Sequence, residues 1–177
     1  MTVRSEVTAY IGLGANLGDP EQAVCSAILQ LRVAPGLRLL QASNLYRSAP
    51  VDSSGPDYIN AVAEIATTLT APDLLAALQA IEQTAGRARP YFNAPRTLDM
   101  DLLLFGSARV ASALLTVPHP RMWARAFVLR PLHELAPGLV SAEALHAVAD
   151  QVCDVGAISG LCAAAPMKTC STCPTGL

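Results

Sequence analysis

The sequence lacks the features that would assign it to a membrane, to export or to a nucleic-acid partner. No run approaches the 18 apolar residues that a membrane-spanning helix needs. Segment 1–7 contains Arg4 and Glu6, and has no apolar stretch of the kind that signal peptides carry. The net charge of −2 gives no overall basic character for binding nucleic acid. We therefore expect a cytoplasmic protein that contacts neither membrane nor nucleic acid.

Motifs of several enzyme classes are also missing. There is no H-E-x-x-H, no Ser/His/Asp order and no Cys beside a His, so hydrolytic readings have no support. Gly12, Gly14 and Gly18 are spaced G-x-G-x-x-x-G, which is one residue too long for the dinucleotide fingerprint, and no Gly-Lys-Ser/Thr follows. We interpret segment 14–18 as a structural turn.

The cysteines lie mostly at the C-terminal end, where four of the five fall in the last 25 residues. Without an export signal we expect no disulfide framework. Cys170 and Cys173 have C-x-x-C spacing, which suits half a zinc site or a redox pair, but no second half follows. We expect a domain at 1–155 and a loose, cysteine-bearing tail at 156–177.

The 177 residues, 52% hydrophobic and 15% charged, are typical of one globular domain with a full core. Apolar periodicity, with Asp-Pro and Ala-Pro at two helix starts, predicts the order β-α-β-β-α-β. We therefore expect an α+β, ferredoxin-like fold with a mainly antiparallel sheet. The expected strands are 7–13, 37–46, 58–68 and the run ending at 105, and the expected helices are 20–33, about 71–86 and about 142–153.

Asp99 and Asp101 are the most informative residues, because they stand two positions apart in a short apolar run that reads as a buried strand. Side chains alternate along a strand, so the two carboxylates share a face and Met100 points the other way. Like charges in apolar surroundings need neutralisation, which Mg²⁺ bound also to substrate phosphates would supply. Solvation or pairing with arginine is the alternative for these residues.

Basic and aromatic residues add to this picture. Seven of the eleven arginines lie between 87 and 130, around the paired aspartates, and arginine suits phosphate oxygens. Tyr58 and Asn60 share a strand face, where a ring and an amide suit a planar heterocycle, although an ordinary strand start would look the same. Phe127 offers a second ring or a core side chain, and His119 is held between two prolines.

These residues make the chain resemble the 6-hydroxymethyl-7,8-dihydropterin pyrophosphokinase family of folate biosynthesis. The most specific blocks are PRTLDMD at 95–101 and LTVPHP at 115–120. The resemblance also covers segments 10–18, 46–50, 56–61, 79–82, 86–89 and 125–127.

The resemblance implies transfer of pyrophosphate from ATP to the hydroxymethyl group of the pterin, with release of AMP. It implies that Asp99 and Asp101 hold two Mg²⁺, and that Arg87 and Arg96 close over the phosphates. The implied ATP-binding residues are Gln79, Glu82, Arg89, Leu102, Thr116, His119 and Arg125. The implied pterin-binding residues are Ser48, Val51, Tyr58, Asn60 and Phe127. We expect a monomer whose partners are these two small molecules.

Two other functions fit part of the pattern. A non-catalytic ferredoxin-like binding module would explain the fold and the face of Tyr58 and Asn60, but not two aspartates beside clustered arginines. Another Mg²⁺-dependent nucleotidyltransferase would explain the aspartates, but it would release pyrophosphate from ATP rather than AMP.

Overall fold

The protein is represented by a computed structural model that describes residues 4–50, 55–85, 97–151 and 153–156. A six-stranded antiparallel sheet has the order β5-β1-β4-β3-β8, with β2 also paired to β4. Its strands are β1 (Val7–Ala15), β2 (Leu37–Ala42), β3 (Leu45–Ser48), β4 (Tyr58–Thr67), β5 (Asp99–Phe105) and β8 (Cys153–Gly156). A separate hairpin consists of β6 (Val110–Ala111) and β7 (Thr116–Val117).

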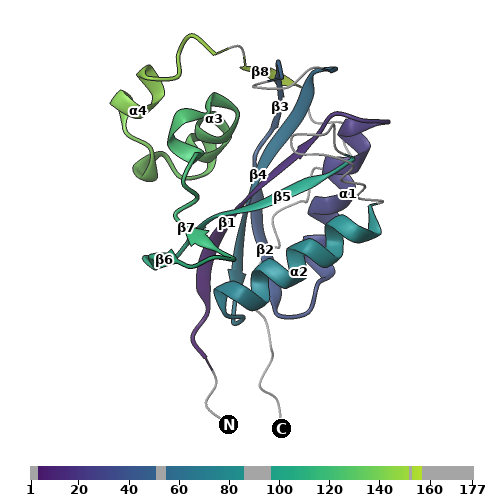
Figure 1. Ribbon diagram of the computed structural model, residues 1–177, viewed down its shortest axis with the longest axis vertical. Coiled ribbons are helices and arrows are strands. Elements are labelled where there is room, and N and C mark those ends of the chain that lie inside the picture. The colour runs from purple at the N-terminus through teal and green to yellow at the C-terminus, as the bar shows by residue number, and fades with distance from the viewer. Residues whose placement is uncertain (1–3, 51–54, 86–96, 152, 157–177) are drawn as a thin grey trace, which may run out of the picture.

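The helices form a layer on each side of the sheet. Helices α1 and α2 lie on one face, and α3, with α4 beside it, lies on the other (Figure 1). The α-helices are α1 (Pro20–Val33), α2 (Ala71–Thr84), α3 (Ala126–Leu135) and α4 (Ala142–His146), and two 3-10 turns are η1 (Met122–Ala124) and η2 (Pro137–Leu139). The β-α-β-β-α-β order and the α+β class are confirmed. Within the described ranges, no helix is long and apolar enough to cross a membrane.

Helices α1 and α2 form for the reasons that the sequence indicated, which are a proline near each helix start and apolar residues at helical spacing. The Asp19 side chain accepts a hydrogen bond from Gln22 N at 3.0 Å and caps α1, and Pro20 occupies the first turn. Thr70 caps α2 in the same way. The buried residues of both helices recur at helical spacing and pack on one face of β1 and β4; they are Val24, Cys25, Ala27, Ile28, Leu31, Leu74, Leu78 and Ile81.

The predicted strand 37–46 is in fact two strands that follow one another along β4. The strand is interrupted at Ser43, whose backbone N donates to Val62 O at 2.9 Å. Ser43 Oγ accepts a hydrogen bond from Val62 N at 3.0 Å. Inside the core, the hydroxyl oxygen thus takes the place of the backbone carbonyl that would accept this bond in a continuous strand. A polar side chain therefore interrupts a run that looks continuous in sequence.

Of the second helical layer, the sequence predicted α4 but not α3. Helix α3 contains Pro131 and begins after Arg125, which offers no side-chain cap, so the usual start and interior signals are missing. It buries Leu129 and Leu132 in a cluster with Val62 on the opposite face of β4. The helix expected at about 142–153 is shorter than predicted, since α4 ends at His146.

The sheet gains a further strand near the C-terminal end. Strand β8 pairs antiparallel with β3, from Ser48 opposite Cys153 to Leu45 opposite Gly156. The division at 155 remains a prediction, because residues 157–177 lie outside the described ranges. Cys25 is disulfide-bonded, which the sequence did not lead us to expect, and Cys153 is a free thiol whose pKa is raised by burial.

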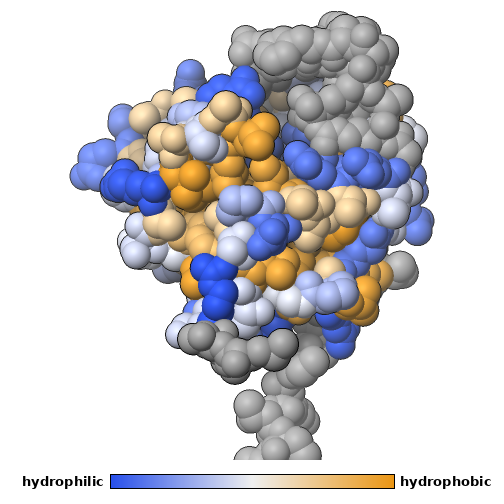
Figure 2. Space-filling model, turned by 60° about the horizontal axis from the view of Figure 1, so that its bottom comes forward, coloured by the Kyte–Doolittle hydropathy of each residue, from blue (hydrophilic) through white to orange (hydrophobic). Residues whose placement is uncertain are grey.

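Apolar side chains also reach the surface. Figure 2 turns the bottom of Figure 1 forward and shows apolar side chains gathered in the middle of that face, bordered by polar ones. The large exposed apolar residues of the described ranges are spread over the turn before α1, α1 itself, β2, the hairpin turn, the 3-10 turns and β8; among them are Val33, Leu40, Leu114 and Leu139. Exposed apolar residues of this kind are common on folded proteins.

Candidate active site

The two aspartates lie on the face of β5 turned away from α1 and α2. Met100 and Leu102 are almost fully buried in the core beneath those helices. Asp99 and Asp101 alternate with them, so they face the α3 side, where both are half-buried. The shared face predicted for the two carboxylates is therefore present in the fold.

Glu82 supports this strand from the opposite side. Its carboxylate Oε1 accepts a hydrogen bond from Met100 N at 2.8 Å, and the side chain is 2% exposed. The contact joins the last turn of α2 to the backbone N–H of Met100, the residue between Asp99 and Asp101. Glu82 thereby fixes the backbone from which both aspartates extend.

His119 reaches the aspartates from the segment after β7. Its Nε2 lies 4.0 Å from Asp101 Oδ2, and its Nδ1 accepts from Arg121 N at 3.3 Å. Burial lowers the pKa of His119, and nearby Arg125 and Arg121 lower it further, against the opposing effect of Asp101 and Asp99. A neutral ring that accepts at Nδ1 carries its proton on Nε2, facing the carboxylate.

A glycine separates the aspartates from the expected pterin residues. On β1, Gly14 lies opposite Asp99 on one side and opposite Asn60 on the other. A Cβ added at Gly14 would lie 3.2 Å from Asn60 Oδ1. Glycine inside a strand is typical of places where another group comes close to the backbone. Gly14 belongs to β1, so the turn expected at 14–18 begins after Ala15.

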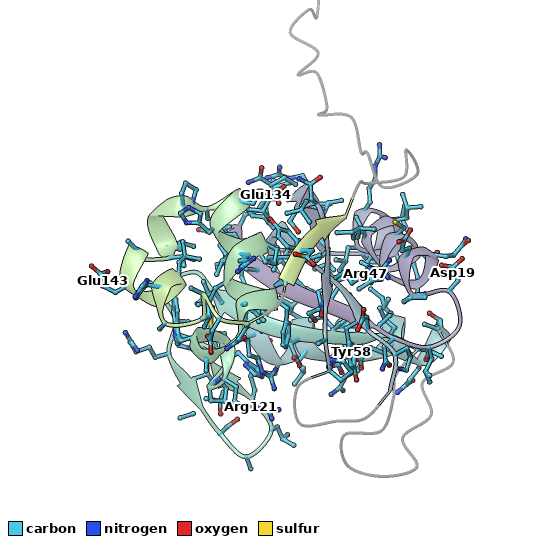
Figure 3. All side chains as sticks on the ribbon, turned by 90° about the horizontal axis from the view of Figure 1, so that it is seen from above. Asp19, Arg47, Tyr58, Arg121, Glu134 and Glu143 are labelled. Atoms are coloured by element: carbon cyan, nitrogen blue, oxygen red, sulfur yellow. The ribbon has the colours of Figure 1, made fainter. Side chains whose placement is uncertain are left out.

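Tyr58, Asn60 and Ser48 lie together at the ends of β4 and β3. Asn60 Nδ2 donates to Ser48 Oγ at 3.0 Å and to Tyr46 O at 3.3 Å, and both Asn60 and Ser48 are buried. Tyr58, labelled in Figure 3, is half-buried. It pairs with Ser48 across the sheet. The amide of Asn60 is thus held in place before any ligand arrives.

Arg125 and Phe127 stand at the start of α3, which covers the same face of the sheet. The guanidinium carbon of Arg125 lies 5.4 Å from the centre of the Phe127 ring. That distance suits a cation–π contact. Phe127 also packs against the cluster beneath α3, so its ring is part of the core as well as a neighbour of Arg125.

Three of the expected ATP residues lie on the other side of β5. Leu102 is 3% exposed within the α1/α2 core, and Glu82 and the exposed Gln79 belong to α2. Thr116 is exposed on β7. Because β5 is the outermost strand at its end of the sheet order, a ligand can contact residues on both of its faces. Four of the expected residues, Val51, Arg87, Arg89 and Arg96, lie outside the described ranges.

The carboxylates have the chemistry of a magnesium site, although they form only part of one. Among the described residues, no three His, Cys, Asp or Glu side chains converge as a metal-binding group. Mg²⁺ is commonly held by one or two carboxylates together with water and substrate phosphates. Asp99 and Asp101 fit that mode.

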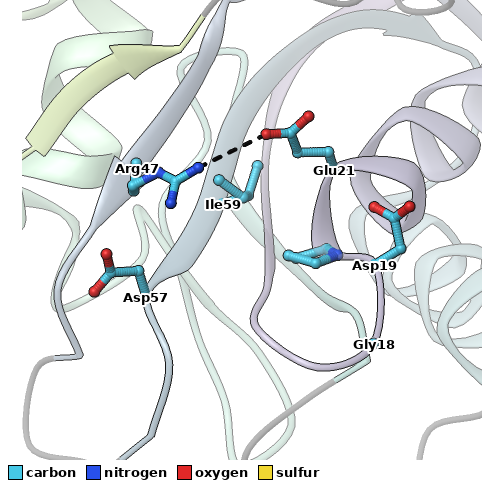
Figure 4. Close-up of a pocket in the computed structure, with 7 residues that line it drawn as sticks. Gly18, Asp19, Glu21, Arg47, Asp57 and Ile59 are labelled. Carbon is cyan, nitrogen blue, oxygen red and sulfur yellow. Dashed lines mark ion pairs between the residues drawn. The ribbon is translucent and has the colours of Figure 1, made fainter.

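A pocket of about 340 Å³ lies on the opposite face of the sheet. Arg47 Nη2 lies 3.9 Å from Glu21 Oε1 within it (Figure 4). Ile59 lines this pocket and belongs to the α1/α2 core, whereas its neighbours Tyr58 and Asn60 face α3. The pocket therefore lies across the sheet from Tyr58, Asn60 and the two aspartates; its lining residues are Gly18, Asp19, Pro20, Glu21, Arg47, Asp57 and Ile59.

Comparison with known proteins decides the family. The model of the 7,8-dihydro-6-hydroxymethylpterin-pyrophosphokinase (HPPK) family matches residues 10–137. This chain belongs to the HPPK family. It is an enzyme of this kind, in a family that acts in folate biosynthesis, uses ATP as a substrate and is generally Mg²⁺-dependent.

Individual relatives agree with the HPPK family match. A protein of Synechocystis sp. is 42% identical over 132 residues, covering 75% of this chain and 68% of its own length. One of Pseudomonas aeruginosa is 44% identical over 138 residues, covering 77% of this chain and 85% of its own. Both are named 2-amino-4-hydroxy-6-hydroxymethyldihydropteridine pyrophosphokinase.

Solved structures support the fold. A Plasmodium falciparum HPPK-DHPS crystal structure with pteroate aligns with a TM-score of 0.57 at 12% identity. The alignment covers 75% of this chain and 40% of that one, so this chain spans less than half of the Plasmodium protein. At this identity the likeness concerns the fold alone.

One structural residue of the site had no signal in the sequence. The Gln151 side chain hydrogen-bonds the backbone on both sides of Arg125. Gln151 lies 25 residues from Ala126 and beyond the segment that the HPPK family model matches. Local spacing carries no information about such a contact.

Proposed function

We propose that this protein transfers pyrophosphate from ATP to the hydroxymethyl group of 6-hydroxymethyl-7,8-dihydropterin and releases AMP. The observation that supports this most is the register Asp99–Gly14–Asn60 across three neighbouring strands. It puts a pair of acidic side chains and a buried amide on one face, with no side chain of β1 between Asp99 and Asn60. A phosphate-bound metal and a planar heterocycle can therefore occupy adjacent positions.

The pterin is bound by two aromatic rings and by an amide whose position is fixed by hydrogen bonds. Tyr58 and Phe127 supply the two rings for stacking, and Asn60, held by Ser48, presents its amide to the edge of the heterocycle. The backbones of Ser48 and Val51 complete this side. The described contacts of Asn60 reduce the freedom that it would lose on binding.

The phosphates of ATP are bound mainly by charged groups. Asp99 and Asp101 would hold two Mg²⁺, which would supply charge neutralisation for the triphosphate and for the transfer. His119, whose Nδ1 accepts from Arg121 N, is free to donate from Nε2 to a phosphate oxygen, and Arg125, Arg87 and Arg96 balance the remaining negative charge. Gln79, Glu82, Arg89, Leu102 and Thr116 complete the ATP side.

The reaction forms one P–O bond and breaks one. The hydroxymethyl oxygen attacks the β-phosphorus of ATP and its proton passes to water, the bond from that phosphorus to the oxygen bridging to the α-phosphate breaks, and AMP leaves. The residues on the face of β5 hold the two substrates so that the attacking oxygen lies in line with the leaving oxygen. Positioning and charge neutralisation account for the catalysis.

The test is to incubate the protein with ATP, Mg²⁺ and hydroxymethyl-dihydropterin and to identify the nucleotide product. AMP supports the proposal, pyrophosphate release would indicate a nucleotidyltransferase, and an unchanged ATP pool would indicate a binding module. Asp101→Asn should lower kcat by about a thousandfold with an unchanged melting temperature, because removing a metal ligand costs several kcal/mol of transition-state stabilisation. The matched control is Asp154→Asn, an exposed aspartate of β8. Full activity in Asp101→Asn would reject the metal assignment.

A further inference from the structure

The chain that leads into α3 is held by the side chain of a residue 25 positions further along the sequence. Gln151, which follows α4, donates from Nε2 to Ala124 O at 2.9 Å. Its Oε1 accepts from Ala126 N at 2.8 Å. The two bonds hold the peptides on either side of Arg125.

The contact replaces a helix cap. The first N–H groups of an α-helix have no partner within the helix, and a Ser, Thr, Asp or Asn at the N-cap position usually accepts from one of them. Arg125 occupies that position in α3 and has no acceptor atom in its side chain, and no side-chain cap is present there. Gln151 supplies the missing acceptor, and so the N-cap position can carry a guanidinium.

Gln151 is itself held in place before any ligand binds. Its backbone N donates to Val148 O at 3.2 Å, on the side toward α4. On the side toward β8, Arg130 of α3 donates from Nη1 to Cys153 O at 2.6 Å. The segment that carries Gln151 is therefore attached to α3 at a second point.

The residue between the two hydrogen bonds belongs to the site. Arg125 lies over the Phe127 ring at 5.4 Å, and its charge acts on His119. A small rotation of the peptides at 124–126 would move the guanidinium through several ångströms, because the side chain is long. The placement of Arg125 thus depends on how rigidly those two peptides are held.

We propose that Gln151 is a positioning residue for nucleotide binding, which acts through Arg125. The inference rests on the proposed function, in which Arg125 binds ATP. Gln151 touches neither substrate. It fixes the backbone so that Arg125 meets the phosphates without first having to be ordered.

The test compares Gln151→Met with Gln41→Met. Both replace a glutamine that hydrogen-bonds the α3 region by a residue of similar size, since Gln41 Nε2 donates to Leu135 O at 3.3 Å at the other end of the helix. Gln151→Met should raise KM for ATP about fivefold, with kcat within about twofold of the wild-type value. This is the result expected when the lost interaction stabilises the bound substrate and the transition state equally. Gln41→Met should leave KM for ATP unchanged.

A second measurement needs no catalysis. Trp123 is the single tryptophan of the chain and lies two residues before Arg125, where it is 42% exposed. Acrylamide quenching of Trp123 fluorescence should increase in Gln151→Met and not in Gln41→Met. Should Gln151→Met fail to fold, Gln151→Asn takes its place, because its side chain is one methylene too short to span both peptides.

The outcomes separate the inference from the proposed function. Equal KM for ATP and equal quenching in the two glutamine variants would overturn the role of Gln151, even if the wild type releases AMP. A wild type that releases no AMP would overturn the proposed function, and unequal quenching would then still show that Gln151 orders this segment. In Arg125→Met, adding Gln151→Met should change KM for ATP by less than about twofold, because the two residues act in one network. A further fivefold rise would reject action through Arg125.

Discussion

Replacing Glu134 by alanine should measurably loosen the attachment of α3 to the sheet. Glu134, labelled in Figure 3, lies near the end of α3 and contacts Asn44, which lies between β2 and β3. Its carboxylate accepts from Asn44 N at 3.0 Å, from Asn44 Nδ2 at 2.9 Å and from Tyr46 OH at 2.8 Å. Three donors separated from it by about ninety positions in the chain converge on one side chain.

The size of the effect follows from these contacts and from exposure. Hydrogen bonds to charged acceptors contribute more than neutral ones, but Glu134 is exposed, so each bond is taken at the low end of the range. We expect Glu134→Ala to lower the free energy of unfolding by about 2 kcal/mol, which corresponds to a melting temperature lower by about 4–8 °C for a chain of this size.

The effect should also depend on pH. Burial, and next the contact with Glu134, raise the pKa of Tyr46. A group whose pKa is raised by folding stabilises the protein below its ordinary pKa, about 10 for tyrosine, and this stabilisation is lost as pH rises further. Wild-type stability should therefore fall above about pH 10, and the fall should be shallower in Glu134→Ala, where one cause of the raised pKa is gone.

Urea unfolding followed by circular dichroism, from pH 7 to pH 11, measures both effects. Glu21→Ala is the matched control, because it removes an exposed glutamate whose contact with Arg47 spans 3.9 Å and should change stability by less than about 0.5 kcal/mol. If Glu134→Ala and Glu21→Ala unfold at the same urea concentration, the hydrogen bonds at Glu134 do not stabilise the fold and the reasoning is wrong.

Three further substitutions test other parts of the structure. Ser43→Ala should cost about 1–3 kcal/mol in urea unfolding, because the buried N–H of Val62 loses its acceptor; no loss would mean that the chain re-pairs at the break. Gly14→Ala should raise KM for the pterin with little change in melting temperature, since the new methyl group would lie 3.2 Å from Asn60 Oδ1, and an unchanged KM would contradict the placement of the pterin. Burial and the neighbouring carboxylate of Glu64 raise the pKa of Tyr10 to about 12. Tyr10→Phe should therefore reduce the loss of stability between about pH 10 and pH 12. Identical stability–pH curves for the wild type and Tyr10→Phe would argue against the contact between Tyr10 and Glu64.

The sequence determined the parts of the protein that depend on neighbours in the chain. Alternation along 99–105 placed Asp99 and Asp101 on one face, and the structure has them so, because the period of a strand follows from backbone geometry alone. The first two helices and their caps could be read for the same reason: Asp19 and Thr70 bond to residues three positions away.

Only the tertiary structure decided which distant residues meet. The break at Ser43, the attachment of Glu134 to Tyr46 and the contact of Gln151 with Ala126 join positions 19, 88 and 25 residues apart. Helix α3 itself escaped prediction, since its cap comes from Gln151 and not from the residue before it. Periodicity and capping rules describe contacts within a few residues, whereas the residues of the candidate site come together by packing on both faces of one sheet, and that packing depends on the whole chain at once.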